Sequence, residues 1–252
     1  ASIPLTPATD ALRPTVFPTA ISEAFGYDGA YYIADTLKVR RGYWIKFASP
    51  QNVGIEGLVR MNDTIPLTDG WNLIGSISAP VARTSVIQIP PGVAPGNYFQ
   101  YSAGYSVTDS IRPAKAYWVK ASGIGKLVFS GTSINKQSGA ESAINELDQL
   151  NSMTVTDQGG GSQQLYFGRA TSADFSPAKY ELPPLPPHGV FDARFIPGNQ
   201  VGLVTDRLLS QTIRIQSSSF PVTIRWHFVQ TGLRSLTFTD ENTSGKLLTV
   251  SS

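Results

Sequence analysis

One segment of this chain occurs twice, and that duplication constrains the fold more than any single residue does. Residues 25–46 recur as residues 99–120, with the same aromatic residues at matching places. Repeated segments of this kind build units that pack against one another, which favours a modular binding or structural protein over an enzyme organised around one site. The matched aromatic positions are Tyr27 with Tyr101, Tyr43 with Tyr117, and Trp44 with Trp118.

The repeat extends upstream of this segment, but only the second copy is complete. The second copy begins with residues 69–76, which contain a Gly-Trp-Asn-Leu-Ile-Gly run, whereas the first copy has no counterpart because residue 1 falls inside the repeat. We therefore expect this chain to be a piece of a longer polypeptide whose first repeat lacks an edge strand. Unpaired backbone groups at such an edge invite a strand from elsewhere, which favours self-association.

The composition fits short strands and many turns. Charged residues make up only 15% of the chain, while it contains 23 glycines and 18 prolines. The net charge of +2 and the scattered basic residues give no stripe that could follow nucleic acid phosphates. The chain has no cysteine, which removes disulfides and cysteine-based zinc sites. It also lacks a run of about 18 apolar residues, so we expect no membrane insertion.

The local pattern within each repeat predicts β-strands. Residues 70–74 and 116–121 are aromatic and β-branched runs bounded by turn residues. In residues 42–47, alternation places Tyr43, Ile45 and Phe47 on one face, and Trp44 and Lys46 on the other. We expect residues 53–59 and residues 125–130 each to fold back on the preceding strand as a hairpin. Each repeat is therefore predicted to be a small β-module.

The character of the chain changes after the second repeat. Ile144, Leu147 and Leu150 stand at helical spacing in a polar stretch, which predicts a linker or short helix. Residues 153–168 predict a hairpin with a glycine-rich tip, and five further strands follow at regular spacing, as in an immunoglobulin-like β-sandwich. The predicted fold is thus all-β: a first repeat over residues 1–68, a second over 69–136, a linker or short helix over 137–151, and a β-sandwich over 152–252.

These motifs resemble the C-terminal region of large secreted bacterial surface proteins exported by the type IX secretion system. The resemblance rests on Gly70–Gly75, Phe99–Tyr101 and Ala116–Lys120, and on residues 165–195 for the following β-domain. It implies an extracellular or cell-surface location and a non-catalytic accessory or assembly module, joined to other domains of a longer parent polypeptide. A C-terminal sorting domain would follow in that family, and the resemblance transfers no catalytic residue.

The polar residues give no strong sign of chemistry. His188 and His227 are the only histidines and do not have the spacing of metal ligands. No Gly-x-Ser-x-Gly elbow is present, and the paired acids at Asp63 and Asp69 suit turns better than glycosidase catalysis. We expect no catalytic residue and no cofactor. Binding of a structural calcium ion by oxygen atoms of the loops stays an open alternative. The proline-rich residues 182–187 predict a rigid crossover between sheets, with a peptide ligand for an aromatic groove as the alternative.

The repeated aromatics are the candidates for ligand or partner contacts. Aromatic faces flanked by polar groups are common on sugar-binding and protein-binding surfaces. Equally, each Tyr-Trp pair could have one member in a module core and the other between the repeats. The sequence favours a structural and interaction module, with a carbohydrate-binding module using Trp44 and Trp118 as the second hypothesis and an accessory region of a secreted hydrolase as the third. The candidate contact residues are Tyr31, Tyr32, Trp44, Tyr105 and Trp118.

Overall fold

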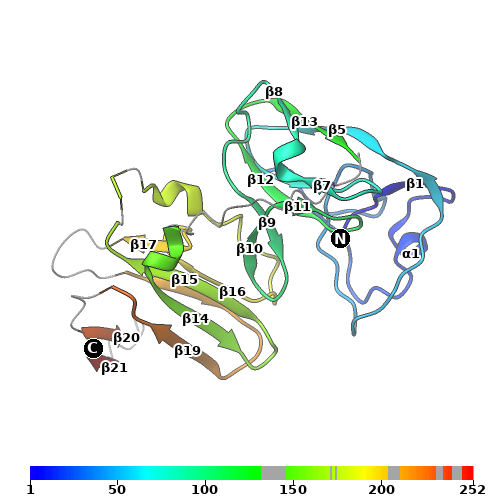
Figure 1. Ribbon diagram of the computed structural model, residues 1–252. Coiled ribbons are helices and arrows are strands. Elements are labelled where there is room, and N and C mark those ends of the chain that lie inside the picture. The colour runs from blue at the N-terminus through cyan, green and yellow to red at the C-terminus, as the bar shows by residue number, and fades with distance from the viewer. Residues whose placement is uncertain are drawn as a thin grey trace.

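The chain folds into two lobes that meet along one junction (Figure 1). The computed structural model describes residues 1–131, 146–170, 172–173, 175–203, 211–230, 235–239 and 246–251. The all-β prediction is confirmed, since the described residues form short antiparallel strands with only brief helical turns. Most of the expected linker or helix, including Ile144, lies outside the described residues. Within it, the 3₁₀ helix η2 (Glu146–Gln149) buries Leu147.

The first part of the N-terminal lobe wraps around a small core of its own. Proline at the start of the single-turn helix α1 suits a position where no backbone N–H is needed, and Pro18 follows its end. Ile3, Leu37 and Tyr43 lie at the centre of the core, and Ile45 and Phe47 pack against it. The elements are β1 (Leu5–Pro7), α1 (Arg13–Val16), β2 (Phe25–Tyr27), β3 (Tyr31–Ile33) and β4 (Gly57–Val59).

The second part of this lobe has two sheets around a larger core. One sheet has the strand order β10-β9-β12-β6, the other has the order β5-β13-β8, and Tyr98, Tyr117 and Phe129 are buried between them. The elements are β5 (Asn62–Leu67), β6 (Gly70–Ile74), β7 (Val81–Ala82), η1 (Arg83–Ser85), β8 (Ile87–Ile89), β9 (Tyr98–Tyr101), β10 (Tyr105–Thr108), β11 (Ser110–Ile111), β12 (Tyr117–Ala121) and β13 (Gly125–Ser130).

The predicted hairpins after the Tyr-Trp strands are wrong. Strand β13 pairs with β5 and β8 instead of β12, because both edges of β12 are already occupied by β6 and β9. Strand β4 pairs with β1 instead of residues 43–47. The segment leading into β4 crosses the first core, against which Val53 and Ile55 pack. In both parts, the segment that follows the Tyr-Trp pair contributes residues to the core, Val53 and Ile55 in the first part and Leu127 and Phe129 in the second.

Equivalent hydrogen bonds recur in the two parts, as a duplicated unit would give. Both Arg40 and Ala114 adopt a positive φ, at 73° and 63°, just before the Tyr-Trp pair. In the first matched pair, Lys38 N–H donates to Tyr43 Oη and Arg112 N–H donates to Tyr117 Oη, both at 2.7 Å. In the second, Arg13 N–H donates to the Asp35 carbonyl at 2.7 Å and Arg83 N–H donates to the Asp109 carbonyl at 2.8 Å. In the third, Asp28 N–H donates to the Ala30 carbonyl and Ser102 N–H donates to the Gly104 carbonyl, both at 3.0 Å.

The C-terminal lobe is β-sandwich-like. A sheet of order β17-β15-β14-β19 faces the β16-β18 pair, and Val155, Leu165 and Phe195 are buried between them. Strands β15 and β17 run parallel, and the immunoglobulin-like detail stays a prediction. The elements are β14 (Asn151–Asp157), β15 (Ser162–Gly168), η3 (Pro177–Tyr180), β16 (Asp192–Phe195), β17 (Val201–Leu203), β18 (Ile213–Gln216), β19 (Val222–His227), β20 (Ser235–Thr239) and β21 (Lys246–Ser251).

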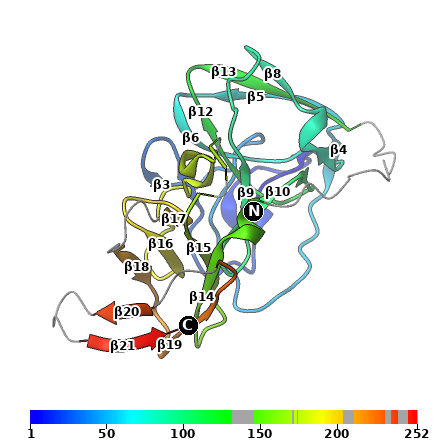
Figure 2. The same ribbon diagram turned by 60° about the vertical axis from the view of Figure 1, so that its left-hand side comes forward.

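The local predictions for this lobe hold at the level of single strands. Strands β14 and β15 form the expected hairpin, in which Gly160 at the tip has φ of 88°. In and after β19, Ile224, Trp226 and Phe228 pack against the core, while Arg225 and His227 are exposed. Figure 2 shows the β20-β21 ribbon at the far end of the lobe. No helix in the described part of the chain has the length and apolar character needed to span a membrane.

The matched tyrosines provide a test of the equivalence between the two parts. Because Tyr43→Phe and Tyr117→Phe each remove the acceptor of a 2.7 Å bond from a backbone N–H, each should lower the free energy of unfolding by about 1–2 kcal/mol. Because the two bonds share no partner, the double variant should show the sum. Urea unfolding followed by circular dichroism would measure all three, and a cost at only one site would contradict the equivalence.

Candidate functional site

The repeated aromatic residues meet between the two parts of the N-terminal lobe. They form one cluster with Leu182 from the other lobe, which we call the aromatic junction. Within each Tyr-Trp pair, the tyrosine points into its own core and the tryptophan points into the junction, because successive residues of a strand face opposite sides. The junction comprises Tyr27, Tyr31, Trp44, Trp71, Leu73, Phe99, Tyr101, Tyr105, Ala116, Trp118 and Leu182.

The contacts within the aromatic junction are reciprocal. Each tryptophan packs edge-to-face against the tyrosine pair of the other repeat, so the two sides present nearly the same surface to each other. This is the geometry of a self-complementary interface, here formed within one chain. The centroid distances are 4.9 Å for Tyr27–Trp118 and 4.7 Å for Trp44–Tyr101, 6.4 Å for Tyr31–Trp118 and 6.3 Å for Trp44–Tyr105, and 5.3 Å for Tyr27–Tyr31 and 5.2 Å for Tyr101–Tyr105.

The C-terminal lobe is hydrogen-bonded to the second repeat. The Gln163 side-chain amide binds the backbone of Tyr105 as a strand would: its Oε1 accepts from the Tyr105 N–H at 2.8 Å, and its Nε2 donates to the Tyr105 carbonyl at 3.0 Å. Ser162 N–H donates to the Ala103 carbonyl at 2.9 Å. At Gly104, between these bonds, a Cβ atom would overlap the Ser162 carbonyl oxygen. Close backbone approach therefore requires glycine here.

Two tyrosine hydroxyls also join the lobes. Tyr101 Oη donates to the Phe191 carbonyl at 2.7 Å, and Tyr105 Oη donates to the Pro184 carbonyl at 2.9 Å. Desolvation raises the pKa of Tyr101 above its ordinary value, and the charges of Asp192 and Asp157 raise it further. Burial likewise raises the pKa of Tyr105 well above the usual range. Both hydroxyls therefore stay protonated, and remain hydrogen-bond donors, at any physiological pH.

A buried ion pair supports the junction from the C-terminal lobe. Arg194 binds both carboxylate oxygens of Asp192, each at 2.7 Å, and donates a third bond to the Pro183 carbonyl at 2.7 Å. Its guanidinium lies 5.8 Å from the centre of the Tyr105 ring. Both charged side chains are almost fully buried, so each depends on the other for compensation.

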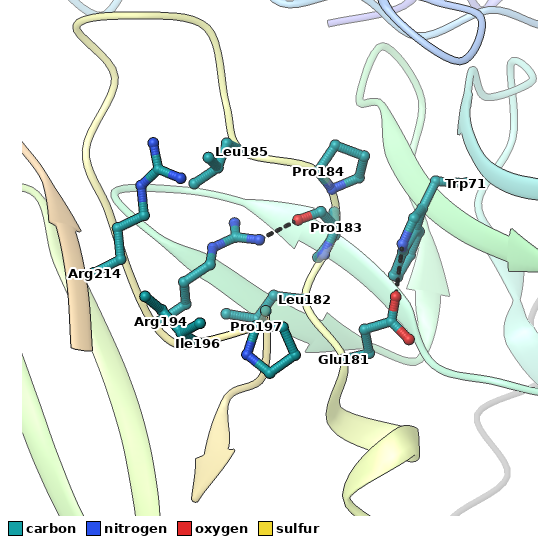
Figure 3. Close-up of a pocket in the computed structure, with 11 residues that line it drawn as sticks. Trp71, Glu181, Leu182, Pro183, Pro184, Leu185, Arg194, Ile196, Pro197 and Arg214 are labelled. Atoms are coloured by element: carbon teal, nitrogen blue, oxygen red, sulfur yellow. Dashed lines mark hydrogen bonds between the residues drawn. The ribbon is translucent and has the colours of Figure 1, made fainter. Parts of the chain in front are cut away.

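A pocket of about 330 Å³ opens where the lobes meet (Figure 3). Trp71 and Glu181 lie on one side of the pocket, and Arg214 lies on the other (Figure 3). Trp71 Nε1 donates a hydrogen bond of 3.4 Å to Glu181 Oε1. Lys120 pairs with Glu181 at 2.6 Å and lies 5.9 Å from the Trp71 ring centre. Residues 182–185 of the proline-rich stretch, which joins η3 to β16, line the pocket, and Pro183 is buried.

The structure distributes the five candidate contact residues over different environments. Tyr105 and Trp118 are 3% and 2% exposed, Tyr31 and Trp44 are half-buried, and Tyr32 is 40% exposed. All except Tyr32 belong to the aromatic junction. Trp118 is therefore not available to stack on a sugar ring, because its surface is covered by neighbouring aromatics and Leu73.

Both histidines lie apart from the junction. His188 and His227 are exposed. Among the described residues, no three histidine or acidic side chains converge as a metal site requires. Asp63, considered above as a turn residue, accepts from its neighbour Thr64 N–H at 2.8 Å and pairs with Arg40. A second pair of neighbouring acids with turn character in the sequence, Asp240 and Glu241, lies outside the described residues.

Sequence reasoning missed three contributors to this region: Trp71 as a pocket wall, Gln163 as a backbone mimic, and the Asp192–Arg194 pair. The alternating Phe-Asp-Ala-Arg-Phe run was the available signal for the last of these, since two opposite charges at this spacing face the same side of a strand. Comparison of the chain with protein-family models, with curated proteins and with solved structures gave no match.

Removing one member of the buried ion pair should be costly. Arg194→Met leaves Asp192 as an unpaired buried charge, so we expect the free energy of unfolding to fall by about 3–5 kcal/mol. Replacing both residues, by Asp192→Leu with Arg194→Met, should recover most of that loss. The matched control is Arg214→Met, because Arg214 is the exposed cross-strand neighbour of Arg194. Chemical denaturation would measure these changes, and equal effects of Arg194→Met and Arg214→Met would contradict the assignment.

The junction should also weaken at alkaline pH. The raised pKa of Tyr101 means that the unfolded chain loses this proton first, near the ordinary tyrosine value of about 10. The contribution of this group to stability is therefore present below pH 10 and is lost as the pH rises above it. Urea titrations between pH 8 and 11 should show this decline, and Tyr101→Phe should make it shallower. An unchanged slope in Tyr101→Phe would show that other groups control the decline.

Proposed function

We propose that this chain is a non-catalytic structural and interaction module of a secreted surface protein. The observation that carries the proposal is the reciprocal packing of Trp44 and Trp118 against the opposite tyrosine pairs. The repeated aromatics, which are the strongest sequence signal, are used mainly to hold the chain's own units together. A chain whose repeated aromatic residues are used for internal packing forms a firm unit, which is suited to hold other domains apart and to present them.

The docking of the C-terminal lobe supports a rigid role. The Gln163 amide, the Tyr101 and Tyr105 hydroxyls and the Ser162 N–H all cross between the lobes. Such a combination of buried aromatic contacts and satisfied polar bonds resists bending more than a flexible linker would. The resemblance of the sequence motifs to type IX secretion substrates supports the part of the proposal that locates this module outside the cell, next to further domains of a parent polypeptide. Detection by a chain-specific antibody on intact cells of the source organism would test that location.

Rigidity can be tested through the unfolding transition. We expect residues 1–252 to unfold in a single step, and Gln163→Ala to separate the unfolding of the two lobes, because Gln163 links the Tyr105 backbone to β15. Gln164→Ala is the matched control, since the Gln164 side chain is exposed. Calorimetry with intrinsic fluorescence would follow both. Two separate transitions in the unaltered chain would contradict the rigid-module proposal.

The interaction part of the proposal includes self-association. Light scattering over a concentration series should show species larger than the monomer as concentration rises. A strict monomer at high concentration would remove self-assembly from the proposal and leave the structural role.

A carbohydrate-binding module is the second candidate, favoured by the pocket at the lobe boundary. Half-buried Trp71 offers an aromatic face, while Glu181 and Arg214 offer hydrogen-bonding groups nearby. A glycan array, followed by tryptophan fluorescence titration of any positive glycan against Trp71→Ala, separates this from the first candidate. Absence of any glycan response, or an equal response in Trp71→Ala, would discard it.

A further inference from the structure

The pocket at the lobe boundary has a wall that is mostly apolar. Its volume of about 330 Å³ is near the lower end of the range for sites that hold small ligands. Proline has no backbone N–H, so the proline residues of this wall offer a ligand no backbone donor. Ile196 is 52% exposed at the pocket, and a ligand there would cover it. The apolar residues of the wall are Leu182, Pro183, Pro184, Leu185, Ile196 and Pro197.

Several backbone groups of this wall are already used within the protein. The Pro183 carbonyl accepts from Arg194 at 2.7 Å, and the Pro184 carbonyl accepts from the Tyr105 hydroxyl at 2.9 Å. Leu182 N–H donates to the Gly198 carbonyl at 2.8 Å. A buried polar group without a partner is costly, so this wall suits a ligand whose surface is largely apolar.

The charged residues of the pocket leave one positive charge uncompensated. Arg194 binds both carboxylate oxygens of Asp192, and Glu181 pairs with Lys120 at 2.6 Å. Arg214, the third charged residue that lines the pocket, is exposed. Within the part of the chain that the structure describes, no acidic side chain pairs with Arg214.

The position of Arg214 makes this charge unfavourable on its own. Arg214 lies directly opposite Arg194 in the register of β16 and β18, so both side chains project from the same face. Like charges at directly opposite positions destabilise a strand pair. Figure 3 shows both arginine side chains at the pocket. Because Asp192 is already bound to Arg194, an anion from outside the chain would find its free partner in Arg214.

We propose that this pocket binds a carboxylate attached to a compact, branched apolar group. The carboxylate would bind Arg214, whose planar guanidinium matches two oxygens at once, and the apolar group would lie against Leu185, Ile196 and Pro197. Two sources carry this chemistry: a free short-chain acid, and the end of a peptide whose last residue is leucine. The inference goes beyond the proposed structural role, and it gives the pocket a ligand class different from the carbohydrate candidate.

A pair of matched small molecules provides a direct test. The intact chain, labelled with ¹⁵N, is titrated with 4-methylpentanoate, and the amide shifts of Ile196 and Gly198 are followed by NMR. We expect saturable shifts at both residues, which line the pocket. The uncharged 4-methylpentanamide has the same apolar group and should bind about tenfold more weakly or worse, because it loses a charge-assisted bond. Acetate lacks the branched group and should also bind at least about tenfold more weakly.

Substitutions on the protein give an independent measurement. Arg214→Gln removes the charge and should weaken binding of 4-methylpentanoate about tenfold or more, whereas Arg214→Lys keeps the charge and should weaken it less. The matched control is Arg225→Gln, because Arg225 is an exposed arginine of β19 that does not line the pocket. Its affinity should stay within about twofold of the unaltered chain. Since Arg214 is exposed, unfolding would not explain a loss in Arg214→Gln, and unchanged amide spectra far from the pocket would verify this.

An acetyl-Gly-Gly-Leu peptide with a free carboxyl end distinguishes the two sources. Tighter binding of this peptide than of 4-methylpentanoate would identify a peptide end as the ligand, and equal or weaker binding would identify a free acid. Equal affinities for 4-methylpentanoate and its amide, no saturable shift with any carboxylate, or full binding by Arg214→Gln would each overturn the inference.

The same titrations separate this inference from the proposed functions. Shifts caused by methyl glucoside, and retained in Arg214→Gln, would support the carbohydrate candidate and contradict the carboxylate site. Two unfolding transitions in the unaltered chain would contradict the rigid module, while a carboxylate that binds through Arg214 would still support the site.

Discussion

The reciprocal insertion of Trp44 and Trp118 between opposite tyrosines is the contact on which the rest of the fold depends. Each repeat is too small to bury both faces of its strands, so the tryptophan face of one is covered by the other. Aromatic pairs in this edge-to-face geometry each contribute about 0.5–1.5 kcal/mol beyond the area that they bury. With the junction in place, the two cores behind it can face away from each other and remain separate.

The C-terminal lobe breaks the near-symmetry of this arrangement. It uses the tyrosines of the second repeat as both hydrogen-bond donors and packing surface, and it adds Leu182 to the cluster. Arg194 donates to the Pro183 carbonyl and lies over the Tyr105 ring, and its charge is balanced by the buried carboxylate of Asp192. Polar groups thus help to position this lobe, and backbone hydrogen bonds such as Gly42 N–H to the Leu73 carbonyl at 3.0 Å join the two repeats beside the aromatic contacts.

The sequence predicted the features that depend on local alternation. The facing of Tyr43 against Trp44, and of Ile224 and Trp226 against Arg225, followed from the period of a strand, and the matched aromatics pointed to two units in contact. Strand partners were harder to predict, because β13 pairs with residues that are distant in the sequence. The local pattern of apolar and polar residues does not indicate which distant strand is the partner. The role of Gln163 could not be predicted for the same reason. Its side-chain amide pairs with the backbone of Tyr105, which is distant in the sequence, and the sequence around Gln163 does not distinguish it from an exposed glutamine of a strand.

Gly104 has a consequence for the orientation of the whole molecule. The first repeat carries Ala30 at the matching position, and a Cβ at Gly104 would overlap the Ser162 carbonyl oxygen. A methyl group at this position would therefore obstruct the close approach of Ser162 that docking on the second repeat requires. Two exact copies of the repeat would offer the C-terminal lobe two equivalent faces. The difference between Gly104 and Ala30 makes these two faces unequal.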